Sequence, residues 1–139
     1  MKNIVSIVLT MMLIGTASGL CQEQMKHVEK NSEHGFAVKE LKAFHDVLHP
    51  LFHDVLPVGD FTTIRSKLDE LLKDAVVIQK AKFPRKLLGR QKEFQKKSAG
   101  LVALLTDMVT MKDKVDDATM EKMFNDMHEA FESLAELVK

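Results

Sequence analysis

The sequence predicts an all-α protein, an antiparallel up-down-up-down four-helix bundle that follows a cleaved signal peptide. Two observations lead to this prediction. From Phe36 onward, apolar residues recur at spacings of three and four, the periodicity of helices that bury one face. Only short breaks interrupt the pattern, and no strand-like alternation competes with it. Short connections between helices of similar length favour antiparallel neighbours.

The first 19 residues have the layout of a secretory signal peptide. Lys2 supplies a positive charge, residues 4–14 form an apolar run, and small residues (Ala17 and Gly19) stand at positions −3 and −1 of a cleavage site. The run is shorter than the about 20 residues that a membrane-spanning helix needs. We therefore expect an exported chain, periplasmic or secreted, with no membrane span once the signal is removed.

Residues 20–35 are polar and aperiodic, and they are expected to form a flexible lead-in to the bundle. Cys21 lies near the expected mature N-terminus and raises the alternative of a lipid anchor. Leu20 precedes it where a small residue is usual, so anchoring at Cys21 is the less favoured alternative. One cysteine forms no internal disulfide, so stability has to come from the core.

The bundle is expected to occupy residues 36–139, and its first two helices are predicted over 36–56 and 60–82. Pro50 lies inside the first helix and should bend it, because proline cannot donate the hydrogen bond to the carbonyl of Asp46. That bend either opens a cavity or curves the helix around the core. Asp60 is a good N-cap for the second helix.

The third helix is predicted over 85–112, after the break at Phe83-Pro84, and the fourth begins after Asp116-Asp117. Carboxylates suit a helix N-terminus. The fourth helix carries apolar residues at spacings of 4, 3, 4, 3 and 4, as expected for helices that pack lengthwise: Met120, Phe124, Met127, Phe131, Leu134 and Val138.

Composition argues against two classes of function. The chain has 20 basic and 20 acidic residues and neither Trp nor Tyr, so it offers no obvious basic or stacking surface for nucleic acid. Its serines and its cysteine stand in no nucleophile–base motif, so we do not expect an enzyme.

Histidines are the most informative residues. FHDVL occurs at 44–48 and again at 52–56, which spaces His45, His49 and His53 four residues apart. Each step of four overshoots a helical turn by about 40°. His45 is therefore expected to face the core, His49 to lie at the border and His53 to face solvent.

A fourth histidine is expected near this row. In an antiparallel alignment of the first and last helices, His128 lies level with residue 46 and at the border of the apolar face. Imidazoles four residues apart reach one ion, and a third from a neighbouring helix completes a site suited to Zn²⁺ or Cu²⁺. Three nearby carboxylates are candidate ligands or hydrogen-bond acceptors: Asp46, Glu129 and Glu132. Alternatively, the histidines are structural or solvated.

Two motifs, FHDVLHPLFHDVLP with Ile64-Arg65 after it and MHEAFESLAE at 127–136, resemble a largely uncharacterised group of small exported bacterial helical-bundle proteins. These share a His-x3-His-Pro-x2-His first helix and a Met-His-x-Ala-Phe-Glu last helix. The similarity covers about residues 38–136, and it implies that the first-helix histidines pair with His128.

The plan is also similar to the soluble b-type cytochromes that form four-helix bundles, which implies haem b as an alternative cofactor held between His45 or His49 and His128. The sequence departs from them, since its first helix has no methionine and His128 lies mid-helix. The expected function is thus metal handling in the cell envelope. The alternatives are a haem-binding electron-transfer protein and a cofactor-free structural or interaction bundle.

Overall fold

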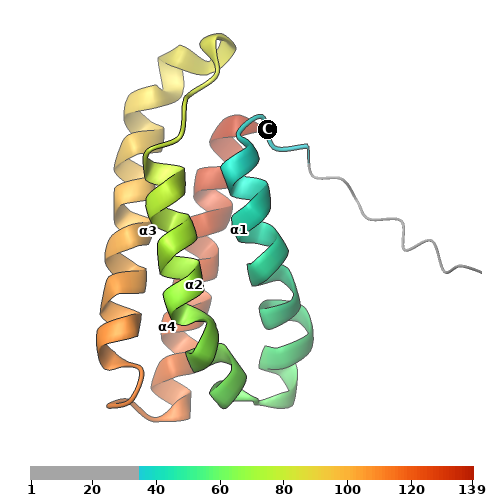
Figure 1. The fold of residues 1–139 in the computed structure, drawn as a ribbon, viewed down its shortest axis with the longest axis vertical. Coiled ribbons are helices and arrows are strands. Elements are labelled where there is room, and N and C mark those ends of the chain that lie inside the picture. Colours follow the sequence, from blue (N-terminus) through green and yellow to red (C-terminus); the bar gives the residue numbers. More distant parts are fainter. Residues whose placement is uncertain (1–34) are drawn as a thin grey trace, which may run out of the picture. The chain divides into compact units, whose positions relative to one another are not determined.

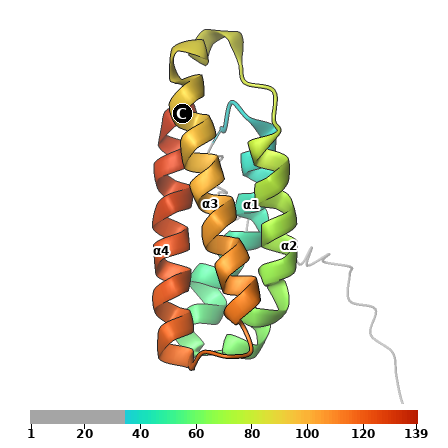
Figure 2. The ribbon, with the colours of Figure 1, turned by 90° about the vertical axis from the view of Figure 1, so that its left-hand side faces the viewer.

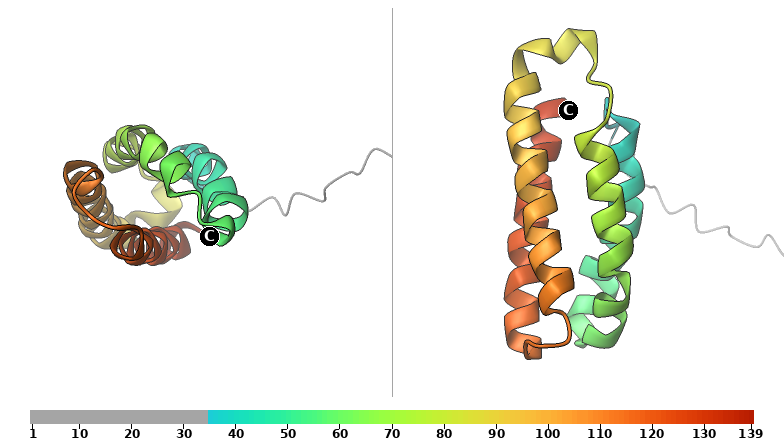
Figure 3. Two further views of the ribbon diagram at one scale, coloured as in Figure 1. Left: turned by 90° about the horizontal axis from the view of Figure 1, so that it is seen from below. Right: turned by 60° about the vertical axis from the view of Figure 1, so that its left-hand side comes forward.

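The computed structural model describes residues 35–139; the predicted signal peptide, Cys21 and the rest of residues 1–34 lie outside the described range. Within it, the chain forms four α-helices and no strand (Figure 1): α1 (Lys39–Pro50), α2 (Phe61–Gln79), α3 (Gln91–Met111) and α4 (Asp117–Ala135). Consecutive helices run antiparallel and follow one another around the bundle (Figures 2 and 3). The predicted all-α four-helix bundle is confirmed.

The first helix is shorter than the predicted 36–56, because α1 stops at Pro50. A π-helical turn, η1 (Leu51–Val55), follows directly, and a 3-10 turn, η2 (Leu56–Val58), comes next. The N–H of Leu56 donates to the carbonyl of Leu51, five residues back. Proline has no N–H to continue the α-helical ladder, and the chain accommodates it by widening the next turn.

Gly59 ends this segment with φ 70°, a left-handed conformation that glycine adopts without steric cost. The predicted N-cap follows immediately. Asp60 Oδ1 accepts from the Thr63 N–H at 3.0 Å, and its Oδ2 accepts from Thr63 Oγ1 at 2.6 Å. The second helix therefore starts where the sequence predicts, although it ends at Gln79 rather than 82.

The third predicted helix, 85–112, is divided into two kinds of helix. Residues Arg85–Arg90 form a 3-10 helix, η3, and regular α-helix begins only at Gln91. Gly89 has a low helix propensity, which weakens a regular first turn here. α4 begins as predicted, since Asp116 Oδ1 accepts from the Thr119 N–H at 2.8 Å. A last 3-10 turn, η4 (Glu136–Val138), ends the chain.

The core takes large apolar side chains from all four helices, and the largest fully buried ones include Phe44, Leu68, Leu105 and Phe124. The helix pairs are not equally close. α2 packs tightly on α3 and α3 on α4, whereas the backbones of α1 and α4 stay farther apart. Aromatic rings fill that seam, including the stacked pair Phe44–Phe131 with centroids 4.9 Å apart. The histidines lie along the same seam.

No helix within residues 35–139 has both the length and the apolar character to cross a bilayer.

Candidate histidine site between the first and last helices

The three histidines of the first helix form a continuous row. The ring centroids of His45 and His49 lie 5.2 Å apart, and those of His49 and His53 lie 4.4 Å apart. His45 is partly buried, whereas His49 and His53 are exposed. His45 is the most buried of the three, as predicted, but His49, which was expected at the border, is exposed like His53. His49, in the middle, has an imidazole neighbour on both sides.

His53 lies in the π-helical turn η1. A π-turn closes its hydrogen bonds over five residues and holds roughly 4.4 residues per turn, so a step of four undershoots the turn instead of overshooting it. Within η1 the backbone therefore rotates against the drift predicted for a pure α-helix. The ring centroids of His49 and His53 are the closer pair of the row, and His53 lies near enough to His128 to act on it electrostatically.

His128 lies on the same seam but meets a phenylalanine. Its ring stacks on Phe52 with 3.7 Å between centroids and 7° between planes. His45, with which it was expected to lie level, instead contacts Phe131 at 6.0 Å and Phe36 at 5.6 Å. The first and last helices therefore run antiparallel with His128 facing the first helix, as predicted. The structure adds an aromatic neighbour, Phe52, that the alignment did not include.

The His128 imidazole is 21% exposed. Burial lowers its pKa below the usual value, the charges of Glu132 and Glu129 act in the opposite direction, and His53 adds to the lowering. Glu132 is the nearest of these carboxylates, with Oε1 3.9 Å from His128 Nε2. The lowered pKa favours the neutral imidazole, which is the form that binds a metal ion.

The candidate carboxylates differ in what they already contact. Both oxygens of Asp46 accept from Lys42 Nζ, at 3.0 and 2.9 Å, so this carboxylate is engaged on the helix surface. Glu132 lies one turn from His128 and is exposed. Its position suits an acceptor that orients the imidazole, a common role for carboxylates beside ligating histidines.

Among residues 35–139, no three His, Cys, Asp or Glu side chains are arranged so as to hold a metal ion. Pairs are a different matter. An ion that binds two imidazoles at about 2.0–2.1 Å with tetrahedral angles leaves the ring centres roughly 5 Å apart. Both spacings in the row are of this size.

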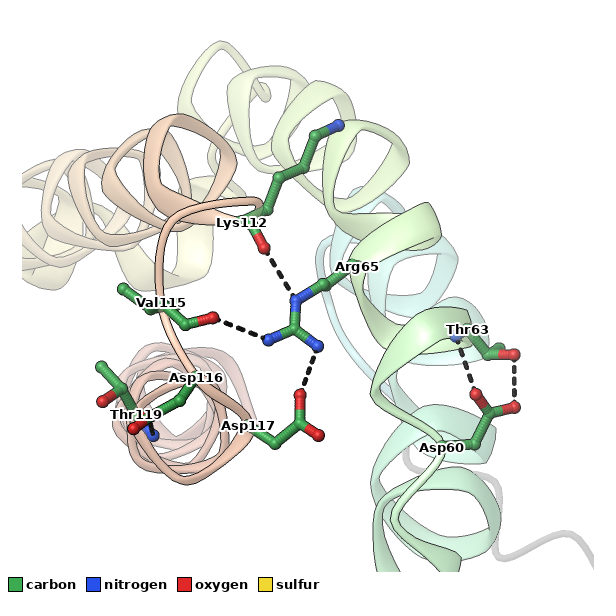
Figure 4. Close-up of polar contacts among 8 residues, drawn as sticks. All are labelled: Asp60, Thr63, Arg65, Lys112, Val115, Asp116, Asp117 and Thr119. Atoms are coloured by element: carbon green, nitrogen blue, oxygen red, sulfur yellow. Dashed lines mark hydrogen bonds and ion pairs between the residues drawn. The ribbon is translucent and has the colours of Figure 1, made fainter.

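Sequence reasoning missed one polar cluster, centred on Arg65 of α2 (Figure 4). Its Nε donates to the Lys112 carbonyl at 2.7 Å, Nη2 to the Val115 carbonyl at 3.0 Å and Nη1 to Asp117 Oδ1 at 2.6 Å. The guanidinium thus ties α2 to the end of α3, the loop and the start of α4. The sequence indicated it only indirectly: α3 ends at Met111 and no glycine caps it, so its last carbonyls need another donor.

A separate open groove of about 470 Å³ lies between α3 and α4. Small and charged side chains line it, among them Gly100, Ala103, Asp107 and Ala130. None of the four candidate histidines belongs to this groove.

No protein-family model matches the chain, and no match is found among curated proteins or among solved structures. The function is therefore argued from the geometry of the chain itself.

Proposed function

We propose that the chain is an exported protein that binds Zn²⁺ or Cu²⁺ along the histidine row of the first helix, for metal handling in the cell envelope. The proposal depends on one observation above all: His49 has imidazole neighbours on both sides, at 5.2 and 4.4 Å. Two imidazoles at this spacing suit the bond lengths and angles of either ion.

His49 is the central ligand in this proposal, and His45 or His53 supplies the second nitrogen. His128 supplies a third from α4 when its ring turns away from Phe52. Its lowered pKa supports this role, because it favours the unprotonated nitrogen. Such a site leaves a coordination position open, which suits transfer of an ion rather than its permanent structural retention.

Haem b is the weaker alternative. A haem between the row and His128 has to displace the rings that fill the seam, and several of these are tightly packed: Phe44 and Phe131 stack at 4.9 Å, and Phe52 and His128 at 3.7 Å. The visible spectrum of protein isolated from its own source separates the two proposals, since a Soret band favours haem. A cofactor-free bundle is the third alternative.

The test is a calorimetric titration of the metal-stripped full chain with Zn²⁺ and with Cu²⁺. We expect one ion per chain, and His49→Ala should lower affinity at least about 10-fold, as losing one of two ligands does. His45→Ala and His53→Ala each leave one pair and should cost less. The sequence has two further histidines, His27 and His34, in the lead-in over residues 20–35. The double variant His27→Ala/His34→Ala controls for weak metal binding by these two.

Several outcomes contradict the proposal. Affinity that His49→Ala leaves unchanged rules out the row, and a loss that appears only in the His27→Ala/His34→Ala variant moves binding to the N-terminal residues. If neither metal nor haem binds, the chain is a cofactor-free structural or interaction bundle.

A further inference from the structure

Charge is strongly segregated along the bundle, although the whole sequence is neutral. Residues 80–97 carry eight Lys or Arg against one carboxylate, Glu93, a net charge of +7. In the rest of the described range, residues 35–79 and 98–139, nine basic residues face sixteen acidic ones. The neutral total therefore hides a basic segment.

This segment forms one end of the bundle. Residues 80–90 connect α2 to α3 as the uppermost part of Figure 1, and residues 91–97 begin α3 just below. The opposite end holds the α1–α2 turn and the α3–α4 loop, which carry several carboxylates: Asp54, Asp60, Asp113, Asp116 and Asp117. We call residues 80–97 the basic end.

Most of its cations are available to a partner. Two are engaged: Arg90 Nη1 donates to the Leu137 carbonyl at 3.1 Å, and Lys97 Nζ donates to Ser133 Oγ at 2.7 Å. Six others are exposed, and none of them takes part in an ion pair with any residue in 35–139: Lys80, Lys82, Arg85, Lys86, Lys92 and Lys96. Six exposed cations at one end of a small bundle favour an anionic partner.

The basic end also presents apolar surface. Leu88 of η3 is 54% exposed and stands among the lysines and arginines, while its neighbour Leu87 is half-buried. Phe83 packs on Phe94 with centroids 4.9 Å apart, which anchors this connection to the bundle. Exposed leucine surrounded by cations is the combination that binds an anionic bilayer, where the side chain enters the acyl boundary and the charges meet the headgroups.

We propose that the basic end docks on an anionic phospholipid surface, with Leu88 inserted and the six exposed cations against the headgroups. The exposed leucine favours lipid over nucleic acid, for which the segment offers charge but no Trp or Tyr to stack on bases. Docked in this way, the bundle stands with its acidic end directed away from the membrane.

The test is sedimentation of the full chain with phosphatidylcholine vesicles, with and without about 30% phosphatidylglycerol, a content that gives the surface the negative potential required. The measured quantity is the difference in bound protein between vesicles with and without phosphatidylglycerol. Lys2 beside the apolar run 4–14 also responds to lipid charge, so the contact is assigned by the variants of the basic end and not by this difference alone. We expect tight binding to anionic vesicles that weakens as salt is raised.

Two variants with matched controls locate the contact. Lys82→Gln/Lys86→Gln should lower anionic binding about 25-fold, from roughly five-fold per charge, whereas the exposed pair Lys73→Gln/Lys114→Gln should not. Leu88→Ser should lower it several-fold, whereas Val58→Ser, at the opposite end and 76% exposed, should not. Circular dichroism confirms that each variant is folded.

Three results overturn the proposal: equal binding to neutral and anionic vesicles, equal losses in the test and control pairs, or no effect of Leu88→Ser. Binding to duplex DNA at the same salt, with no vesicle binding, assigns the basic end to nucleic acid instead.

Discussion

The ring of His128 on α4 lies parallel to the ring of Phe52, at 3.7 Å between centroids and 7° between planes. Phe52 belongs to the π-turn that follows Pro50. The irregularity in the first helix therefore determines which side chain meets the last helix at this level.

Replacing Phe52 by alanine should destabilise the bundle by about 2 kcal/mol, since the ring is partly buried and stacks on both His128 and Phe124. Phe52→Leu keeps most of the apolar volume and should cost about 1 kcal/mol, the contribution of the ring pairing. Urea denaturation measures both. If His128 is a metal ligand held by Phe52, Phe52→Ala also tightens Zn²⁺ binding; unchanged affinity argues against His128 as a ligand.

Acidification should destabilise the protein through His128. Its pKa is lowered in the folded state, mainly by burial, so the unfolded chain binds more protons between the folded pKa and about 6.5. The stabilisation that follows from this lowered pKa is fully present above about pH 6.5. It is lost as pH falls through the pKa of His128 in the folded protein. Each unit of lowering corresponds to about 1.4 kcal/mol.

Free energies of unfolding measured between pH 7.5 and 5 test this, with His128→Gln as the control that lacks the titrating group. The wild-type protein should lose more stability on acidification than the variant. Equal losses would assign the pH dependence to other groups, and an NMR titration of the His128 ring then reports its pKa directly.

Arg65→Lys should destabilise the bundle by about 1–3 kcal/mol, although it keeps the charge. An ammonium cannot reproduce the fork that serves Lys112, Val115 and Asp117, so partly buried carbonyls lose their donor. Thermal denaturation provides the measurement. Lys67→Ala, which breaks only the exposed pair with Glu70, is the control and should cost less than about 1 kcal/mol. Equal effects would reduce the Arg65 cluster to an ordinary surface contact.

Gly59→Ala should cost about 1–2 kcal/mol, because a side chain at φ 70° is strained whatever space surrounds it. Gly100→Ala serves as the opposite control. It lies inside α3, where an added Cβ meets nothing within 4 Å, so the change should stabilise the protein by up to about 1 kcal/mol. Calorimetry should show a lower melting temperature for Gly59→Ala and a higher one for Gly100→Ala. Shifts in the same direction contradict the left-handed conformation given to Gly59.

The bundle was predictable because each helix buries one face, and a buried face requires apolar residues at a regular spacing of three and four. Phe124, Phe131 and Met127 are buried as their spacing indicates. The first helix was predicted as one regular helix to 56; helical turns do continue to Val58, but the regular α-helix ends at Pro50. Pro50 showed that the helix would be disturbed, but it did not show how. A bend and a π-turn are both compatible with the same residues, and the structure has the π-turn.

The histidine site was predictable only in its outline. Spacing indicated that His45 is the most buried of the three first-helix histidines, and antiparallel alignment brought His128 to the same seam. Side-chain rotamers decide which rings touch, and periodicity carries no information on them. The resemblance to exported bacterial bundle proteins and the export of the chain stay predictions.

The wide seam between α1 and α4 has a consequence for the order in which the protein opens. Arg65 and the ion pair from Lys112 to Asp69, 2.6 Å long, hold α2 to the α3–α4 loop, whereas α1 is short, ends at a proline and meets α4 through rings. Local unfolding should therefore begin at α1, whose amides exchange with solvent first. An ion bound by both His49 and His128 would then hold α1 to α4 and slow the local unfolding of α1.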